Sequence, residues 1–200
     1  MLPWGHAGLG YLLYAGLALA TGRRLPRGWP LAALLVGTQF PDLVDKPLAF
    51  LGVLPNGRTG VHTLLVTTLL LAATWLVAVR VDAGTDGRTP RAVPWSTAGS
   101  GRGGAREVAL AYSVGHLSHL LGDSYAALLT GYWRGFAFLL YPFVPAPRYL
   151  ADRVAPWERL ADAALTTRVT FQVVLAVGAG LVLLYGAYRR QGRRTIAPRR

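Results

Sequence analysis

VTFQVVLAVGAGLVLLYGAY, residues 169–188, contains no charged side chain. A helix needs about 20 apolar residues to cross the hydrocarbon core of a bilayer, and this run has that length. Residues 61–79 form a second uncharged stretch of similar length. The two stretches predict membrane-spanning helices, which makes the chain an integral membrane protein.

Three other apolar stretches extend this prediction. Residues 108–131 are as long and carry one charge, Asp123, while residues 7–21 and 30–40 are shorter. The fold class that follows is all-α, a polytopic membrane helix bundle with about five transmembrane helices. Residues 136–144 are too short to cross and end in a proline-rich stretch, so they predict a short re-entrant or interfacial segment.

The composition of the chain agrees with a membrane setting. Hydrophobic residues make up 52% of it, only 15% of residues are charged, and the mean hydropathy is +0.35. Soluble domains average about 25% charged residues. Cysteine is absent, so any metal ion must be held by nitrogen and oxygen ligands.

The net charge of +12 comes from arginines in connecting segments. Loops rich in arginine and lysine stay cytoplasmic, so residues 23–27, 80–106 and 189–200 predict a plasma-membrane protein with its N-terminus outside and its C-terminus inside. The whole chain, 1–200, is then one integral membrane domain, with 82–106 as a flexible basic cytoplasmic loop and 189–200 as a basic tail. Such a tail favours contact with membrane lipids, and no nucleic acid is expected as a partner.

Histidine and aspartate side chains gather at one predicted depth. His6 precedes the first helix, Asp42 and Asp45 follow the second, and His62 opens the third. Asp123 lies toward the exit of the fourth helix, so all these positions fall on the predicted outer side. The fourth helix also carries histidines at 116 and 119, and a spacing of three and four residues places both on one face with Asp123.

An ionisable side chain in the hydrocarbon is unfavourable, by about 3 kcal/mol for aspartate at a helix centre, unless it is paired, hydrated or bound to a metal. Imidazole and carboxylate together are ligands for zinc, or for manganese or iron where carboxylates predominate. A bound divalent metal ion supplies hydroxide near neutral pH, and hydrolysis uses it most directly.

Each position also has a structural interpretation. Asp42 could be a turn or capping residue after Pro41, and Asp45 could form an ion pair with Lys46. His62 could cap the third helix. His119 and Asp123 could be a buried hydrogen-bonded pair, and His116, which lies deepest, could serve only as a hydrogen bond between helices.

Four short motifs occur in an order that resembles a known family. They are GTQFPDLVD (37–45), RTGVHT (58–63), GHLSHLLGD (115–123) and LYP (140–142). This order is similar to that of the YdjM-like membrane-bound metal-dependent hydrolases, a domain of unknown function, and the resemblance covers roughly residues 6–143 of this chain.

The resemblance implies a metal site and an accompanying arginine. The implied metal-site candidates are His6, Asp42, Asp45, His62, His119 and Asp123, with Arg58 matching the family's arginine. The chain departs from the family pattern at Gly57, where many relatives have histidine, and at Thr63, where the family has serine. His116 stands where the family usually has an apolar residue, which makes it a further candidate ligand.

The functional hypothesis is a membrane-bound metal-dependent hydrolase that acts on an ester or phosphoester, such as a lipid headgroup linkage, or on a small molecule at the membrane surface. Arg58 would stabilise the developing oxyanion, and Asp45 would act behind the ligands as a base or bridge two ions. One alternative is a transporter or channel component that uses the same side chains to move protons or metal ions. Another is a membrane scaffold without chemistry.

Overall fold

The computed structural model describes residues 1–85, 104–145, 158 and 167–196. Within these residues every regular element is a helix, which confirms the all-α prediction. The elements are α1 (Pro3–Ala20), α2 (Trp29–Phe50), α3 (Leu64–Thr85), α4 (Gly104–Thr130), the 3₁₀ helix η1 (Trp133–Leu140) and α6 (Thr167–Ile196).

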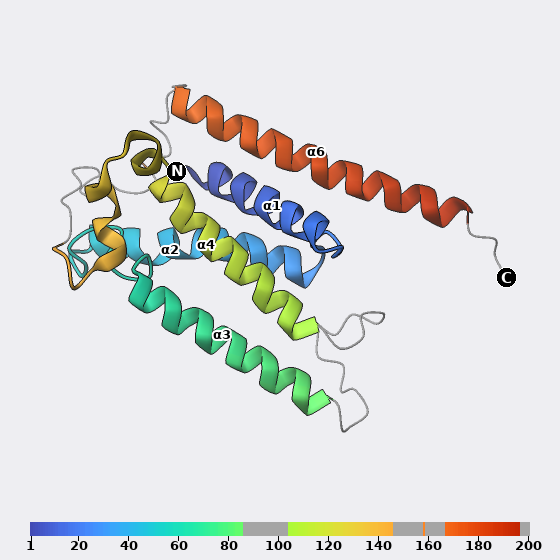
Figure 1. Ribbon diagram of the computed structural model, residues 1–200, viewed down its shortest axis with the longest axis horizontal. Helices are drawn as coiled ribbons and strands as arrows, with labels where there is room; N and C mark the ends of the chain where they lie inside the picture. The colour runs from blue at the N-terminus through green and yellow to red at the C-terminus, as the bar shows by residue number, and fades with distance from the viewer. Residues whose placement is uncertain (86–103, 146–157, 159–166, 197–200) are drawn as a thin grey trace.

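Successive long helices run in alternating directions, so their termini lie at two ends of the bundle (Figure 1). The start of α1, residues 51–63 and η1 lie at one end, and residues 21–28 lie at the other. Helices α2 and α4 form the most extensive contact, with α1 packed on both, α3 on α4, and α6 mainly on α1. The polar residues predicted to share one depth therefore reach the same end.

Two glycines explain the close crossing of α2 and α4. A Cβ added to Gly37 would lie 2.4 Å from the Tyr112 carbonyl oxygen, and one added to Gly115 would lie 2.3 Å from the Leu34 carbonyl oxygen. Only a residue without a side chain fits either position, as is common where membrane helices approach closely. This contact brings the second half of α2 beside that of α4.

Two helices are long and apolar enough to cross a membrane: Leu64–Gly84 of α3, with mean hydropathy 2.1, and Val169–Arg189 of α6, with 2.0. Only 11% of each window is buried inside the protein, so their leucine and valine side chains face outward, as lipid-facing residues do. Helices α1, α2 and α4 also form where the apolar stretches predict them, but glycine, serine, histidine and aspartate lower their hydropathy. Of the predicted five spans, composition thus supports two.

Several helix boundaries differ from the prediction. Helix α2 does not end at Phe40 but continues through Pro41 and Pro47 to Phe50. Proline removes a helical hydrogen bond, but the Pro41 ring is fully buried in the bundle, and packing outweighs the local preference. Asp42 and Asp45 are therefore helical residues one turn apart, so the structural alternative for Asp42, a turn or capping residue, does not hold.

Residues 82–85 and 104–106 of the predicted basic loop are helical, because α3 runs to Thr85 and α4 begins at Gly104; residues 86–103 lie outside the described residues. Helix α3 starts at Leu64 rather than at residue 61. Thr63 Oγ1 accepts a hydrogen bond from the Val66 amide (3.3 Å), so Thr63, not His62, caps this helix. Helix α6 runs past residue 188 to Ile196, into the predicted tail.

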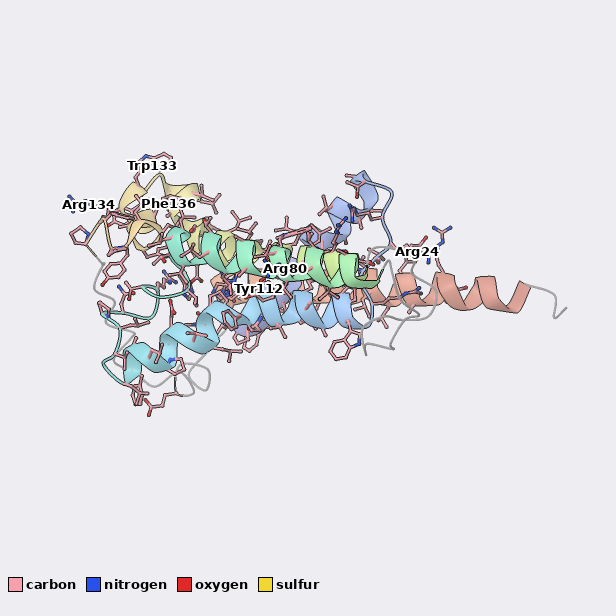
Figure 2. The ribbon with its side chains drawn as sticks, turned by 90° about the horizontal axis from the view of Figure 1, so that it is seen from below. Arg24, Arg80, Tyr112, Trp133, Arg134 and Phe136 are labelled. Atoms are coloured by element: carbon pink, nitrogen blue, oxygen red, sulfur yellow. The ribbon has the colours of Figure 1, made fainter. Side chains whose placement is uncertain are left out.

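The short apolar segment after α4 folds as η1 and the turn that follows it. Figure 2 shows Trp133, Arg134 and Phe136 at the end of the bundle opposite Arg24. The side chains of Tyr132, Trp133 and Phe143 are exposed, while Phe138 is fully buried. Exposed aromatic rings at one end of a membrane bundle are typical of an interfacial segment.

Candidate metal centre

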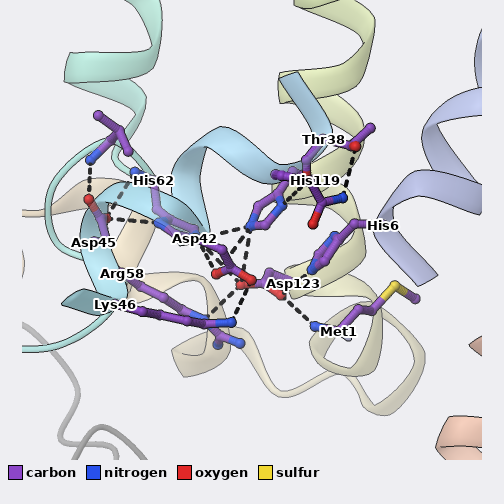
Figure 3. Close-up of polar contacts among 12 residues, drawn as sticks. Met1, His6, Thr38, Asp42, Asp45, Lys46, Arg58, His62, His119 and Asp123 are labelled. Carbon is purple, nitrogen blue, oxygen red and sulfur yellow. Dashed lines mark hydrogen bonds and ion pairs between the residues drawn. The ribbon is translucent and has the colours of Figure 1, made fainter. Parts of the chain in front are cut away.

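Four side chains from three segments converge at the end of the bundle that carries η1 (Figure 3). Asp42 comes from α2, His62 from residues 51–63, and His119 and Asp123 from adjacent turns of α4. One ligand atom of each lies within 4.8 Å of the others. Two imidazole nitrogens and two carboxylate oxygens thus point at a common volume.

The spacing of these atoms tests whether a metal ion fits. Zinc bonds of 2.0–2.1 Å in a tetrahedron place neighbouring ligand atoms about 3.3 Å apart. His62 Nε2 lies 3.1 Å from His119 Nε2, 3.5 Å from Asp42 Oδ1 and 3.6 Å from Asp123 Oδ2. His119 Nε2 lies 3.6 Å from Asp42 Oδ1 and 4.0 Å from Asp123 Oδ2. These separations surround the tetrahedral value, so the donor set fits a zinc-sized cation.

The backbone of α2 orients the His119 ring. His119 Nδ1 lies 2.7 Å from the Thr38 carbonyl oxygen, and a carbonyl can only accept, so Nδ1 carries the proton. In the neutral ring, Nε2 then turns a lone pair toward the cluster. Metal-binding histidines are commonly oriented in this way by a second hydrogen bond.

Asp45 performs the corresponding task for His62. Asp45 Oδ2 accepts from His62 Nδ1 (2.8 Å) and from the Gly60 amide (2.9 Å), and Oδ1 accepts from the Val61 amide (2.9 Å). A Cβ on Gly60 would lie 2.4 Å from Asp45 Oδ1, so the motif needs glycine there. Asp45 is fully buried behind the ring and outside the ligand group, which does not fit a bridging ligand or a base that touches water.

Two cations border the cluster on its accessible side. Arg58 Nε lies 2.8 Å from Asp123 Oδ2, and Lys46 Nζ pairs with Asp42 Oδ2, so Lys46 does not form the ion pair with Asp45 that was the structural alternative. Their side chains are 28% and 23% exposed, whereas Asp123 is 2% exposed. Arg58 and Lys46 therefore form the boundary between the buried carboxylates and the outside.

The carboxylates around His62 favour a positive charge on its ring. Burial lowers the pKa of His62, but the three surrounding carboxylates, of which Asp123 contributes most, outweigh burial and raise the pKa to about 10. A proton on His62 is the smallest cation that the cluster can hold, and a metal ion would have to displace it.

The two remaining histidines differ in their relation to the cluster. His6 stacks on His119 with ring centroids 3.8 Å apart, and its Nε2 lies 3.4 Å from Asp123 Oδ1, which also contacts the Met1 amino group at 2.8 Å. Neither nitrogen of His6 makes a hydrogen bond of ordinary geometry within the described residues. His116 instead contacts Thr67 Oγ1 through Nε2 (3.1 Å), and the structure does not bring it to the ligand group.

Phe138 and Thr38 are site residues that the sequence reasoning missed. The Phe138 ring meets the His62 ring edge to face (6.2 Å between centroids) and lies 5.4 Å from the Arg58 guanidinium carbon. Thr38 contributes only a backbone carbonyl, which carries no residue-type signal. For Phe138, the available signal was the short apolar segment after the fourth helix.

The fold and site define an all-helical membrane protein with a candidate metal centre at one end of its bundle. The chain belongs to the YdjM inner membrane protein family, which matches residues 1–195. The match confirms the resemblance and extends it beyond residues 6–143, to include α6. No curated protein and no solved structure matches the chain.

Proposed function

We propose that this protein is a membrane-bound metal-dependent hydrolase whose divalent cation is held by Asp42, His62, His119 and Asp123. The convergence of these four ligand atoms within 4.8 Å is the observation that carries the proposal. Two histidines and two carboxylates at tetrahedral spacing favour zinc, with manganese or iron as the alternatives. His6, stacked beside the group, is a further ligand candidate.

A divalent cation here would supply an activated water near neutral pH. Side chains around the cation would stabilise the charge that develops on the substrate. In ester or phosphoester hydrolysis, the water oxygen bonds to the carbonyl carbon or phosphorus, negative charge develops on the substrate oxygens, and the alcohol leaves with a proton. Arg58 lies where its guanidinium can offset that charge, since it reaches Asp123 from the exposed side.

The orientation of the helices in the membrane determines at which membrane surface the metal centre lies. We propose that the five long helices cross the bilayer with the metal centre at the outer surface. In support, Arg23, Arg24 and Arg27 occupy the connection at the opposite end, where cytoplasmic basic residues belong. Membrane lipids are then the partners, and a lipid or small molecule bearing an ester or phosphoester is the substrate; no nucleic acid is involved.

A transporter would need a polar path from the site to the other end. The His116–Thr67 contact and, one turn deeper, the bond from Trp75 Nε1 to Ser113 Oγ (3.1 Å) extend polar contacts toward the middle of the bundle. Beyond them, the described side chains that line the space between α2, α3 and α4 are almost all apolar. This arrangement favours a site open to one side, and a scaffold does not explain the ligand spacing.

The test is hydrolysis of p-nitrophenyl phosphate and p-nitrophenyl esters by detergent-purified protein, with and without added zinc or manganese. We expect turnover that a chelator abolishes and metal restores. Arg58→Ala should lose turnover and keep its metal, whereas Arg80→Ala, an exposed arginine near the other end of α3, should keep both. Equal turnover in wild type and His119→Asn would reject the proposal.

A further inference from the structure

An apolar groove lies between the first turns of α3 and the chain that follows Phe138. Its volume is about 320 Å³, and its walls include Leu64, Leu65 and Leu69 on one side and Leu139, Leu140 and Phe143 on the other. Most of these side chains are substantially exposed. The groove is therefore an open apolar surface of the kind that an alkyl chain fills.

Both walls of the groove continue directly into the candidate metal centre. Leu64 follows His62 by two residues, with the helix cap Thr63 between them. On the other wall, Leu139 follows Phe138, whose ring contacts both His62 and Arg58. The groove is thus adjacent along the chain to the ligand candidate His62 on one wall and to the ring that contacts it on the other.

The partly exposed charged groups at the metal centre are cations. Arg58 and Lys46 are the partly exposed groups at the cluster, and the carboxylates that they contact are nearly buried. Arginine and lysine together are the usual recognition groups for phosphate. An apolar groove whose wall continues from Phe138, the ring that Arg58 contacts, fits an anionic amphiphile.

We propose that the groove holds the hydrocarbon chain of a membrane lipid phosphate, whose phosphate lies against Arg58 and Lys46 beside the metal centre. This inference rests on the proposed function, because it names the substrate class of the same site. The lipid enters sideways from the bilayer, since α3, which forms one wall, is itself a membrane-compatible helix with exposed leucines. The ligand is thus a lipid phosphate, whose hydrocarbon chain binds the groove while its phosphate binds the two cations.

The experiment uses the full chain in phosphatidylcholine nanodiscs and two photoreactive probes, a diazirine-bearing dodecyl phosphate and the matching dodecanol. Labelled peptides are quantified by mass spectrometry, with lipid-facing α6 as the internal reference. We expect the phosphate probe to label residues 64–69 and 139–143 about tenfold more than α6, because charge-assisted hydrogen bonds add to chain binding. The alcohol probe should show no such preference.

Two matched variants test the groove itself. Leu69→Trp fills it, and Leu76→Trp makes the same change at an exposed leucine of α3 outside it. We expect the tenfold preference to vanish in Leu69→Trp and to persist in Leu76→Trp, with the same melting temperature in both. Arg58→Gln should reduce labelling by the phosphate probe alone.

Equal labelling of the two tryptophan variants would overturn the inference. A competition experiment could also overturn it. If inorganic phosphate displaced the phosphate probe as effectively as unlabelled dodecyl phosphate does, the hydrocarbon chain would contribute nothing to binding. Metal content, measured on the same samples, separates the two proposals. Preferential labelling without bound metal supports the groove and defeats the hydrolase, while bound metal without preferential labelling does the reverse.

Discussion

Asp45→Asn isolates the contribution of the buried carboxylate behind His62. The substitution keeps the shape of the side chain but replaces one oxygen with an NH₂ group, which cannot accept a hydrogen bond. In the native protein, Asp45 Oδ2 serves His62 Nδ1 and the Gly60 amide, and Oδ1 serves the Val61 amide. Whichever way the amide turns, at least one of these buried or part-buried donors loses its acceptor.

The magnitude follows from those contacts. A buried donor without an acceptor costs about 1–3 kcal/mol, so unfolding should become easier by that amount. Loss of the group that orients a metal-binding histidine lowers metal affinity about 10- to 100-fold. We therefore expect the zinc Kd of Asp45→Asn to rise by that factor while the protein remains folded.

The assay is competition for zinc with a chromogenic chelator in detergent. The matched control is Asp82→Asn, which changes the same residue type on the far part of α3, where Asp82 pairs with Arg106. The control should keep the wild-type Kd. A folded Asp45→Asn protein with a Kd within threefold of wild type would refute the inferred role of Asp45.

Three further predictions test the packing of α2 against α4, the burial of Phe138 and the release of a proton from His62 on metal binding. Gly37→Ala should destabilise the protein by about 1–3 kcal/mol through overpacking, whereas Gly16→Ala, which meets nothing within 4 Å inside α1, should not destabilise it; equal shifts in melting temperature would contradict this. Phe138→Ala should cost about 3–5 kcal/mol, against under about 0.5 for exposed Phe143→Ala, and a small effect at Phe138 in thermal unfolding would show that its ring is not packed in the interior. Zinc affinity should rise about tenfold per pH unit between about pH 6 and 8, because the pKa of His62 is raised to about 10 and binding must release its proton. An affinity independent of pH would mean that His62 is not a ligand.

The sequence predicts the helices well where apolar length alone decides them. Residues 61–79 and 169–188 lie largely within α3 and α6, the two membrane-compatible helices. The end of α2 was mispredicted because proline is a local signal. Burial of Pro41 against neighbouring helices is a property of the assembled bundle.

For the site, the sequence identifies candidate residues but not how their roles divide. His116 and His119 share one face of α4, yet only His119 meets the ligand group, because the register of α4 against α2 and α3 decides which turn faces it. Asp42 and Asp45 are likewise one turn apart on α2. Their separation into a candidate ligand and an orienting group depends on the path of residues 51–63, which no periodic pattern predicts.

The central claim is a metal ion at Asp42, His62, His119 and Asp123, and metal content per chain tests it most directly. Elemental analysis of purified wild type, His62→Ala and His119→Asn should be accompanied by thermal unfolding to show that each variant is folded. The account predicts a stoichiometric divalent ion in wild type and its loss in both variants. Wild-type protein without bound metal, even after incubation with zinc and manganese, would contradict it.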